Sequence, residues 1–390
     1  MNIAILGAGV AGISTAIALK QKGFESTVYE RHHSPSHQGA GIVVWPNAAY
    51  ILDQLGVLDD VARVSGRPSY MRRISRTGEA LGAIDIGQIN RHMNYPSYSV
   101  FRKDLQAILT SKLMSLGGHI HYNHGVTGID SIAPKTTTVH FQNGQSITPE
   151  IIVGADGRMN SYARHYVLGN NTPTYQKFIN WTGTFESSIN VFQDISIADY
   201  WGVGERFGIV PVAPNKAYWA GGIASPDSTP RRPADYKKEL MSVFSDWPDP
   251  VKIIIEGTPV ERINKIHVHD HDPANLWHKH NLIMIGDAAH APLPTSGQGA
   301  CQALEDAWHL ADRLSQPFNT LQQAFEQFTA MRLEKTTQIT MAARGFAASL
   351  FNRDIAFCTE RNEISKATDF EAAAKGMSGL WGTGLPLQTK

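Results

Sequence analysis

Short apolar runs that end in glycine-rich turns mark three widely separated places in the chain. Residues 3–6, 151–153 and 282–285 are such runs. Runs of this length, bounded by turn residues, are typical of buried strands. The first run is followed by a helical stretch to about Lys22 and then by a second strand over residues 26–30. This strand–helix–strand order predicts an α/β fold built on a parallel sheet.

Alternating apolar and polar positions dominate two other segments, residues 70–86 and 177–262. Stretches such as 208–211 and 216–223 have the two-residue period of half-buried strands. Such alternation indicates a second, mostly antiparallel sheet.

Helical spacing takes over after Asp306, with a break near Pro317. The pattern predicts helices to roughly Lys375, where Gly376 can end the last one. The glycine-rich tail beyond it is expected to be loose.

The first glycine-rich turn has the spacing of a dinucleotide site. Gly7, Gly9 and Gly12 follow the first strand and open the first helix. In this context Gly7 makes the tight turn, Gly9 lets a pyrophosphate approach the helix N-terminus, and Gly12 lets helix and strand pack closely. Glu30, at the end of the second strand, is placed for a pair of ribose hydroxyls. The alternative is a glycine turn in an α/β unit that binds no nucleotide.

The last glycine-rich stretch predicts a loop that binds a ring. Asp287 follows the strand over 282–285 at its carboxyl end, where open α/β sheets bind ligands. Pro294 fixes the loop, and Gly297 and Gly299 let backbone N–H groups approach a ring at the start of the next helix. The positive end of that helix suits the negative charge of a reduced flavin.

The middle stretch ends in the acidic turn Asp156-Gly157, with Arg164 downstream. In this order the three stretches resemble the class A flavoprotein monooxygenases, the aromatic hydroxylase family. In that family the last pattern continues to an Asp-Ala pair, which stands here at Asp306-Ala307. The resemblance implies noncovalent FAD, with NAD(P)H as a transient co-substrate and O2 as the oxidant. No second strand–GxGxxG–helix unit is present for a nicotinamide dinucleotide, which is also typical of the family.

The resemblance also implies the domain organisation. It predicts a Rossmann-like FAD-binding domain of the three-layer ββα type, interleaved with a mostly antiparallel-sheet substrate domain and C-terminal helices. We expect residues 1–70, 98–175 and 263–390 to form the FAD-binding domain with the C-terminal helices. Residues 71–97 and 176–262 are expected to form the substrate domain.

Positions expected to bind the cofactor are spread over the motifs and over further segments that resemble the family. There, the equivalent of segment 39–43 runs beneath the ribityl chain, and the equivalent of Arg102 contacts the ribityl and pyrophosphate region. The resemblance places adenine near Val126 and the Asp-Gly segment with Arg164 near the pyrophosphate of both cofactors. The expected cofactor-binding residues are Gly7, Gly9, Ala11, Gly12, Glu30, Arg31, Gly41, Val43, Arg102, Val126, Asp156, Asp287, Gly297, Gln298, Gly299 and Ala300.

The reaction that the resemblance implies is hydroxylation or epoxidation of a small planar aromatic or heteroaromatic molecule through a C4a-hydroperoxyflavin. This oxidant transfers electrophilic oxygen, so a group that stabilises an anionic, electron-rich substrate raises reactivity. Arg206 can supply a charge and Tyr218 a hydrogen bond.

The spacing of Arg206 and Tyr218 resembles the urate-hydroxylating branch of the family, in which their equivalents lie in the substrate pocket. We expect a catalytic site of Arg206, Tyr218 and Pro294. Thr295 stands where that branch has Asp, so the resemblance leaves the identity of the substrate open, urate included. The alternatives are a solvated surface arginine and a half-buried strand tyrosine.

Charge and cysteine content narrow the range of partners. Lys plus Arg and Asp plus Glu both number 35, so no long-range field attracts nucleic acid or acidic membrane. Two cysteines are too few for a disulfide framework, and no apolar stretch approaches the ~18 residues that span a bilayer. Without an apolar leader, we expect a cytoplasmic monomer or homodimer whose partner is a small molecule.

Histidines crowd into residues 267–280, but no metal site is expected there. The segment lacks an HxxxH helix pair or a CxxC motif, so a solvated connection is the preferred interpretation. Two other function classes stay open for the chain. One is a flavin dehydrogenase or oxidase that takes electrons from its substrate, and the other is a non-catalytic flavin-binding sensor or sequestering protein.

Overall fold

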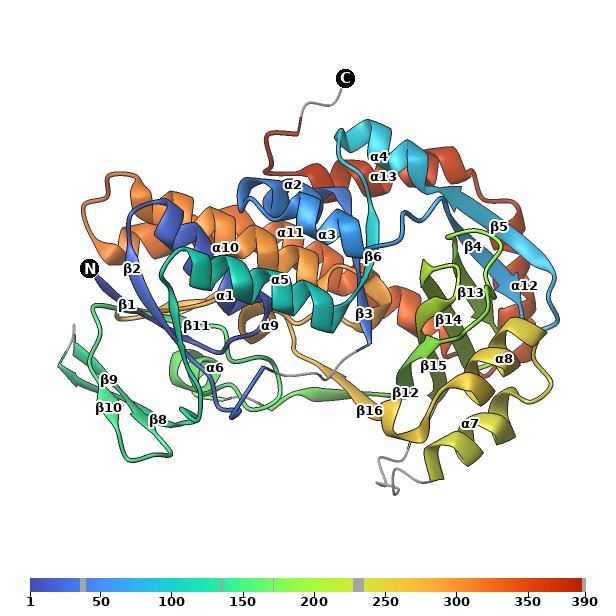
Figure 1. Cartoon of the computed structure of the whole chain (residues 1–390), viewed down its shortest axis with the longest axis horizontal. Coiled ribbons are helices and arrows are strands. Elements are labelled where there is room, and N and C mark those ends of the chain that lie inside the picture. The colour runs from blue at the N-terminus through green and yellow to red at the C-terminus, as the bar shows by residue number, and fades with distance from the viewer. Residues whose placement is uncertain (36–39, 134–135, 171, 227–234, 388–390) are drawn as a thin grey trace.

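Two sheets organise the part of the chain that the computed structural model describes (Figure 1). The described residues are 1–35, 40–133, 136–170, 172–226 and 235–387. Gly39, from the segment expected beneath a ribityl chain, lies outside them.

The first sheet is parallel apart from its edge strand β17, and its strand order is β17-β18-β11-β1-β2-β7. Helices α1, α5 and α10 cover one face, and the antiparallel β10-β9-β8 sheet lies beyond the other (Figure 1). This is the predicted three-layer arrangement. The strands of the parallel sheet are β1 Asn2–Leu6, β2 Glu25–Tyr29, β7 His119–His121, β11 Ile151–Gly154, β17 His278–Lys279 and β18 Leu282–Met284. Those of the small antiparallel sheet are β8 Val126–Ala133, β9 Thr136–Phe141 and β10 Ser146–Ile147.

The second sheet has the order β16-β12-β15-β14-β13-β4-β5 and is antiparallel except where β13 meets β4. Its apolar face packs under helices α7 and α8, through residues such as Trp181, Phe207 and Trp219. The predicted antiparallel sheet is therefore confirmed. Its strands are β4 Tyr70–Ser75, β5 Ala80–Asp85, β12 Thr174–Glu186, β13 Ile197–Trp201, β14 Glu205–Ala213, β15 Lys216–Ala224 and β16 Ile263–Asp270.

Helices connect and cover the two sheets, and the short β3–β6 ladder lies between them (Figure 1). None of the helices in the described part of the chain has both the length and the apolar composition needed to cross a bilayer. The elements are β3 Gly41–Val44, β6 Tyr98–Phe101, α1 Val10–Gln21, α2 Pro46–Gln54, α3 Leu58–Val64, α4 Ile86–Met93, α5 Arg102–Ser115, α6 Tyr162–Leu168, α7 Tyr236–Phe244, α8 Asp249–Gly257, α9 Asp287–His290, α10 Gly299–Ser315, α11 Leu321–Leu350, α12 Ile355–Lys366 and α13 Phe370–Gly382.

The end of the last helix differs from the sequence prediction. Helix α13 continues through Gly376 to Gly382. Ala374, Ser378 and Trp381 are buried at helical spacing, and this packing outweighs the ~1 kcal/mol that a mid-helix glycine costs. The end of α13 is held in place, because Lys335 Nζ donates hydrogen bonds to the carbonyl oxygens of Trp381, in the last turn, and of Thr383, directly after the helix.

Strand β16 lies where the chain was expected to return to the first domain, at residue 263. It pairs with β12 over most of its length, from Thr174 opposite Asp270 to Gly183 opposite Ile263. The second sheet therefore continues past residue 262 before the chain enters β18.

Candidate functional site

The three glycine-rich stretches meet at one edge of the parallel sheet. Strand β1 lies between β2 and β11, and β11 pairs with β18, with Leu6 opposite Gly154 and Gly154 opposite Met284. A Cβ atom on Gly7 would overlap the carbonyl oxygen of Ala155, so the first and second turns touch. The motifs therefore share the carboxyl edge of the strands, where open α/β sheets bind ligands.

The N-terminus of α1 is open and unobstructed. Gly9 is its N-cap, and apart from its own chain neighbours no atom of the described residues lies within 4 Å of the position that a Gly9 Cβ would take. Gly7 has a φ of +109°, and a Cβ on Gly12 would overlap the Gly7 carbonyl oxygen. Free backbone N–H groups at such a helix end suit a pyrophosphate, so the cradle fits FAD.

Glu30 links the end of β2 to the glycine turn. Its Oε2 accepts a hydrogen bond of 2.8 Å from the Ala8 N–H, and its Oε1 accepts one of 2.9 Å from the His32 N–H. The Arg31 side chain lies against Gly125, directly before Val126. Glu30, Arg31 and Val126 therefore lie at the same end of β2, beside the glycine turn.

Asp287, which belongs to the third motif, faces Arg158 of the second motif on one side and Gly299 on the other. Its Oδ2 is 3.9 Å from Arg158 Nη1, and a Cβ on Gly299 would lie 3.9 Å from its Oδ1. Its side chain is 40% exposed, so it remains accessible to a ligand. Arg158 was missed from the sequence, although it directly follows Asp156-Gly157.

Asp156 and Arg164 brace this edge of the sheet. Asp156 accepts hydrogen bonds of 2.6 Å from Ser161 Oγ and 3.1 Å from the Ala163 N–H. Burial raises the pKa of Asp156, and these hydrogen bonds oppose the rise. Arg164 is buried, and its Nη1 donates to the carbonyl oxygens of Ala288 and Ala289 at 3.0 and 3.1 Å. Its guanidinium is thus occupied by α9, and Arg158 is the arginine of this segment that faces Asp287.

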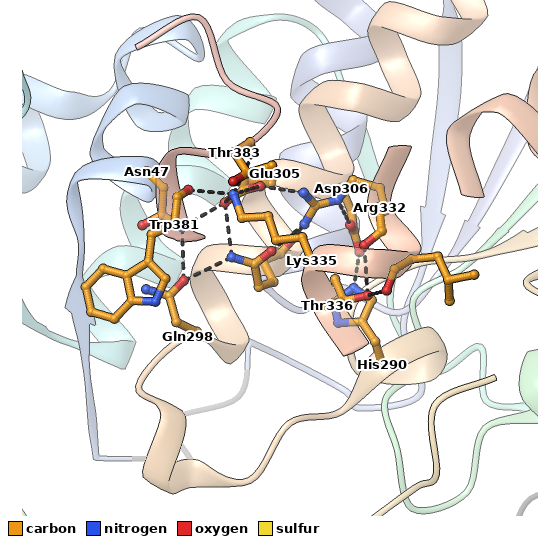
Figure 2. Close-up of polar contacts among 12 residues, drawn as sticks. Asn47, His290, Gln298, Glu305, Asp306, Arg332, Lys335, Thr336, Trp381 and Thr383 are labelled. Carbon is orange, nitrogen blue, oxygen red and sulfur yellow. Dashed lines mark hydrogen bonds and ion pairs between the residues drawn. The ribbon is translucent and has the colours of Figure 1, made fainter. Parts of the chain in front are cut away.

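A buried ionic network holds the loop after α9 (Figure 2). Asp306 accepts hydrogen bonds of 2.7 Å from the Gly286 N–H and from Arg332 Nε, and its other contact is His290 Nε2 at 2.5 Å. Burial opposes ionisation of Asp306, but His290 and Arg332 outweigh it and lower its pKa. His290 therefore has a structural partner in Asp306.

Glu305 forms the second half of the network. It accepts hydrogen bonds from Asn47 Nδ2 at 2.7 Å and from Lys335 Nζ at 2.9 Å, and it pairs with Arg332. Asn47 also donates to Gln298 Oε1 at 2.9 Å, so the Gly297–Gly299 loop is tied to both α2 and α10 (Figure 2).

Three buried polar atoms beside this loop have no hydrogen-bond partner within the described residues. They are the donors Gln298 Nε2 and Trp45 Nε1 and the acceptor Asn47 Oδ1. Buried polar groups are rarely left unpaired in folded proteins. An isoalloxazine ring carries carbonyl acceptors and an imide N–H, so the unpaired atoms fit the flavin end of FAD.

One face of β14 and β15 turns from the α7–α8 core toward this loop. Phe207 and Ile209 pack in that core, so Arg206, Gly208 and Val210 lie on the opposite face. Val210 is opposite Tyr218, which places Tyr218 on the same face as Arg206.

Tyr218 reaches the FAD-binding domain. A Cβ on Gly41 would overlap its ring, and its hydroxyl has no hydrogen-bond partner within the described residues. Burial, and to a smaller extent Cys301, raises the pKa of Tyr218 well above its ordinary value. The hydroxyl is therefore a protonated donor. Burial also raises the pKa of Cys301 to about 12, which excludes a thiolate nucleophile there at neutral pH.

Arg206 is not a freely solvated side chain. Its Nε donates a hydrogen bond of 2.6 Å to Asp199 Oδ1, and the side chain is 19% exposed. Asp199 was not anticipated from the sequence, because its pairing depends on the register of β13 against β14.

The remaining expected site residues lie around the same loop. Pro294 begins a short 3-10 turn, and Thr295 Oγ1 donates to the Ala343 carbonyl oxygen at 2.9 Å. The hydroxyl that replaces the carboxylate of the urate branch is thus engaged with α11. Gly41 and Val43 both lie on β3, and Gly41 is opposite Phe101 of β6. Arg102 directly follows Phe101 and is the first residue of α5, so it also lies near Gly41. Ala300 is in the first turn of α10.

The sequence predicted that the histidine-rich segment is a solvated connection, and this prediction is wrong for part of it. Asp270 and His271 are buried, and Arg344 pairs with Asp270 at 2.6 Å. Pairing of β16 with β12 draws these residues into the fold. Within the described residues, no cluster of His, Cys, Asp or Glu has the arrangement of a metal site.

Known proteins are similar to this chain in sequence and in architecture. A family model described as the FAD binding domain matches residues 1–343. Aurachin C monooxygenase/isomerase of Stigmatella aurantiaca is 29% identical and covers 86% of each chain. An FAD-dependent urate hydroxylase of Mycolicibacterium vanbaalenii is 28% identical, covering 88% of this chain and 87% of its own. A 6-hydroxynicotinate 3-monooxygenase of Pseudomonas fluorescens is 29% identical and covers 92% and 94%.

Solved structures show the same fold over 90–100% of this chain. Klebsiella pneumoniae HpxO, complexed with FAD and uric acid, has a TM-score of 0.89 at 26% identity and covers 100% of this chain and 98% of its own. The 2,6-dihydroxypyridine-3-hydroxylase of Arthrobacter nicotinovorans has a TM-score of 0.77 at 20% identity, covering 90% and 93%.

Proposed function

Because the chain belongs to the FAD binding domain family and is a flavoprotein monooxygenase, we propose that it uses NAD(P)H and dioxygen to hydroxylate a small heteroaromatic ring. The ring binds as an anion. The observation that carries the proposal is the shared face of Arg206 and Tyr218, which turns toward the flavin loop. Relatives named for urate and hydroxynicotinate support a ring of this kind.

We assign one part of the cofactor to each of three elements. The N-terminus of α1 holds the pyrophosphate, Glu30 the ribose, and the loop before α10 the flavin ring. When bound, FAD would supply the redox chemistry, which takes electrons from NAD(P)H and uses dioxygen, with one oxygen atom going to the substrate and the other leaving as water. The positive end of α10 stabilises negative charge on the reduced ring.

The residues of the second sheet bind and orient the substrate. Arg206 stabilises the anionic form of the ring, which makes its carbon atoms more electron-rich. Tyr218 donates a hydrogen bond from the opposite end of the face. Between them lie Gly208, which the Arg206 guanidinium overlies, and Ala220, which is opposite Gly208. Tyr218 is opposite Val210, which is four residues from Arg206 on β14. At ~3.3 Å per residue, Arg206 and Tyr218 lie about 13 Å apart along the strands.

A turnover experiment with isotopically labelled dioxygen tests the proposal. Uric acid, 6-hydroxynicotinate, 3-amino-4-hydroxybenzoate and 2,6-dihydroxypyridine serve as candidate rings. At least one should accelerate NAD(P)H oxidation and yield a product with one labelled oxygen atom. The proposal fails if every ring gives hydrogen peroxide alone, or if the product oxygen comes from water. Reduction of FAD by the ring without NAD(P)H would instead support the dehydrogenase alternative.

Two variants assign the roles of the site. Arg206→Met should keep FAD and lose product per NAD(P)H, because removing the partner of a buried anion costs about 2–5 kcal/mol. Asp287→Ala should instead lower the FAD content of the purified protein. If Arg206→Met retains wild-type coupling, the substrate pocket lies elsewhere.

A further inference from the structure

Asp199 is a buried carboxylate that grips one end of the Arg206 guanidinium. Its Oδ1 accepts the 2.6 Å hydrogen bond from Arg206 Nε, and its Oδ2 accepts one of 2.9 Å from Trp201 Nε1. Its residue exposure is 5%. Both carboxylate oxygens therefore have fixed partners, and Trp201 sets the orientation that Asp199 offers to Arg206.

The other end of the Arg206 guanidinium is unengaged. Within the described residues, neither terminal nitrogen of Arg206 has a hydrogen-bond partner, so the contact with Asp199 uses Nε alone. Gly208 lies opposite Asp199, and a Cβ there would be 3.3 Å from Arg206 Nη2. The guanidinium thus lies over a glycine, with its two terminal nitrogens available as a fork for a planar anion.

Asp199 does not neutralise this end of the pocket. Arg73 and Arg361 lie over the Trp201 ring, 5.2 and 5.3 Å from its centroid. Burial lowers the pKa of both guanidiniums, and Asp199 opposes the decrease. Among the described residues, three guanidiniums therefore interact with this one carboxylate, and positive charge remains for an anionic ligand.

We propose that Asp199 is the positioning residue of the substrate pocket. By fixing Nε, it presents the terminal nitrogens of Arg206 to the anionic edge of the ring and holds the reacting carbon at a constant place relative to the flavin loop. The proposal rests on the function proposed above. Asp199 does not touch the substrate, and it acts through Arg206.

Affinity and coupling should separate in the variant Asp199→Asn. Loss of the negative charge strengthens the field that attracts an anion, so the Kd for uric acid or 6-hydroxynicotinate, read from the flavin absorbance, should stay the same or fall. Asn has one acceptor oxygen for the two donors Arg206 Nε and Trp201 Nε1, so the guanidinium should lose its fixed orientation. This loss should lower product per NAD(P)H roughly tenfold, within the range of coupling between contacting residues. A residue that only supports the fold would lose FAD and ligand affinity together.

A double-mutant cycle shows whether Asp199 acts through Arg206. In the Arg206→Met background, Asp199→Asn should change coupling by less than about twofold, because there is no guanidinium left to orient. The matched control is Asp194→Asn, since Asp194 also pairs with an arginine of this sheet, Arg72 of β4, but both side chains are exposed, at 42% for Arg72 and 45% for Asp194. It should leave FAD content, Kd and coupling unchanged.

The outcomes distinguish this inference from the proposed function. Tighter binding with wild-type coupling in Asp199→Asn would reduce Asp199 to a charge-balancing group and overturn the inference alone. An equal loss in both backgrounds would also overturn it, because the effect would not pass through Arg206. If the wild-type protein neither binds nor oxidises any of the candidate rings, the proposed function fails first.

Discussion

Tyr218 has a buried hydroxyl with no hydrogen-bond partner within the described residues. Leaving such a group unpaired costs free energy, and folded proteins usually avoid it. The tyrosine is also packed against Gly41, so its position is fixed before any ligand arrives. At the scale of the residue, the unpaired hydroxyl indicates a ligand contact better than the sequence could, because its isolation depends on what surrounds it.

Tyr218→Phe should therefore leave the stability of the unliganded protein unchanged or slightly higher, since no hydrogen bond of the fold is lost. Ligand affinity should fall by about 0.5–1.5 kcal/mol, the value of one neutral hydrogen bond. Ligand titration of the flavin absorbance and thermal unfolding check the two parts. Tyr200→Phe is the control, because Tyr200 packs in the α7–α8 core on the opposite face. An unchanged Kd in Tyr218→Phe would remove this hydroxyl from the pocket.

At the scale of the element, alternation along β14 and β15 was readable from the sequence, but its functional pairing was not. The two-residue period predicted which residues share a face, and Arg206 and Tyr218 do share one. The Asp199–Arg206 contact depends on the register of β13, which follows a loop of no regular pattern. The end of helix α13 was predicted wrongly for a related reason. The sequence near Trp381 does not show that this residue is buried, so Gly376 was taken as the end of the helix.

Gly376 and Gly169 give a matched test of how α13 ends. At both glycines the described residues place no tertiary contact within 4 Å of the position that a Cβ would take. Gly169 has a φ of +74° as the C-cap of α6, whereas Gly376 lies inside α13. Gly376→Ala should raise the free energy of unfolding by about 0.5–1 kcal/mol. Gly169→Ala should lower it by about 1 kcal/mol, because alanine is strained in the left-handed region. Denaturant unfolding measures both, and destabilisation by Gly376→Ala would mean that the helix ends there after all.

At the scale of the whole molecule, the sequence predicted the convergence of three distant motifs. Parallel strands align their carboxyl ends, so turns after β1, β11 and β18 had to meet if the strands were neighbours. The links that complete the site were not predictable. Lys335 bonds to the backbone carbonyls of Trp381 and Thr383, and Arg164 to those of α9. Any residue supplies a carbonyl, so such partners leave no trace in the sequence.

The buried network between α10 and α11 should also make the protein sensitive to acid. His309 lies beside it on α10, is 6% exposed, and has an Nε2 without a hydrogen-bond partner within the described residues. Burial, together with the charges of Arg332 and Lys335, lowers the pKa of His309 from 6.5 to about 4, against the opposing effect of Glu305 and Asp306.

The sign of the resulting pH dependence follows from proton uptake. The unfolded chain binds a proton at this histidine near pH 6.5, whereas the folded protein does so only near pH 4, so acid favours unfolding between these values. Between pH 6.5 and pH 4, proton uptake at His309 in the unfolded chain should lower the free energy of unfolding by about 3 kcal/mol. His309→Gln should flatten the fall in unfolding free energy of the FAD-bound protein between pH 7 and about pH 4.5, and His119→Gln, at an exposed position, should not. Equal slopes in the wild type and His309→Gln would show that the acid sensitivity arises elsewhere in the fold.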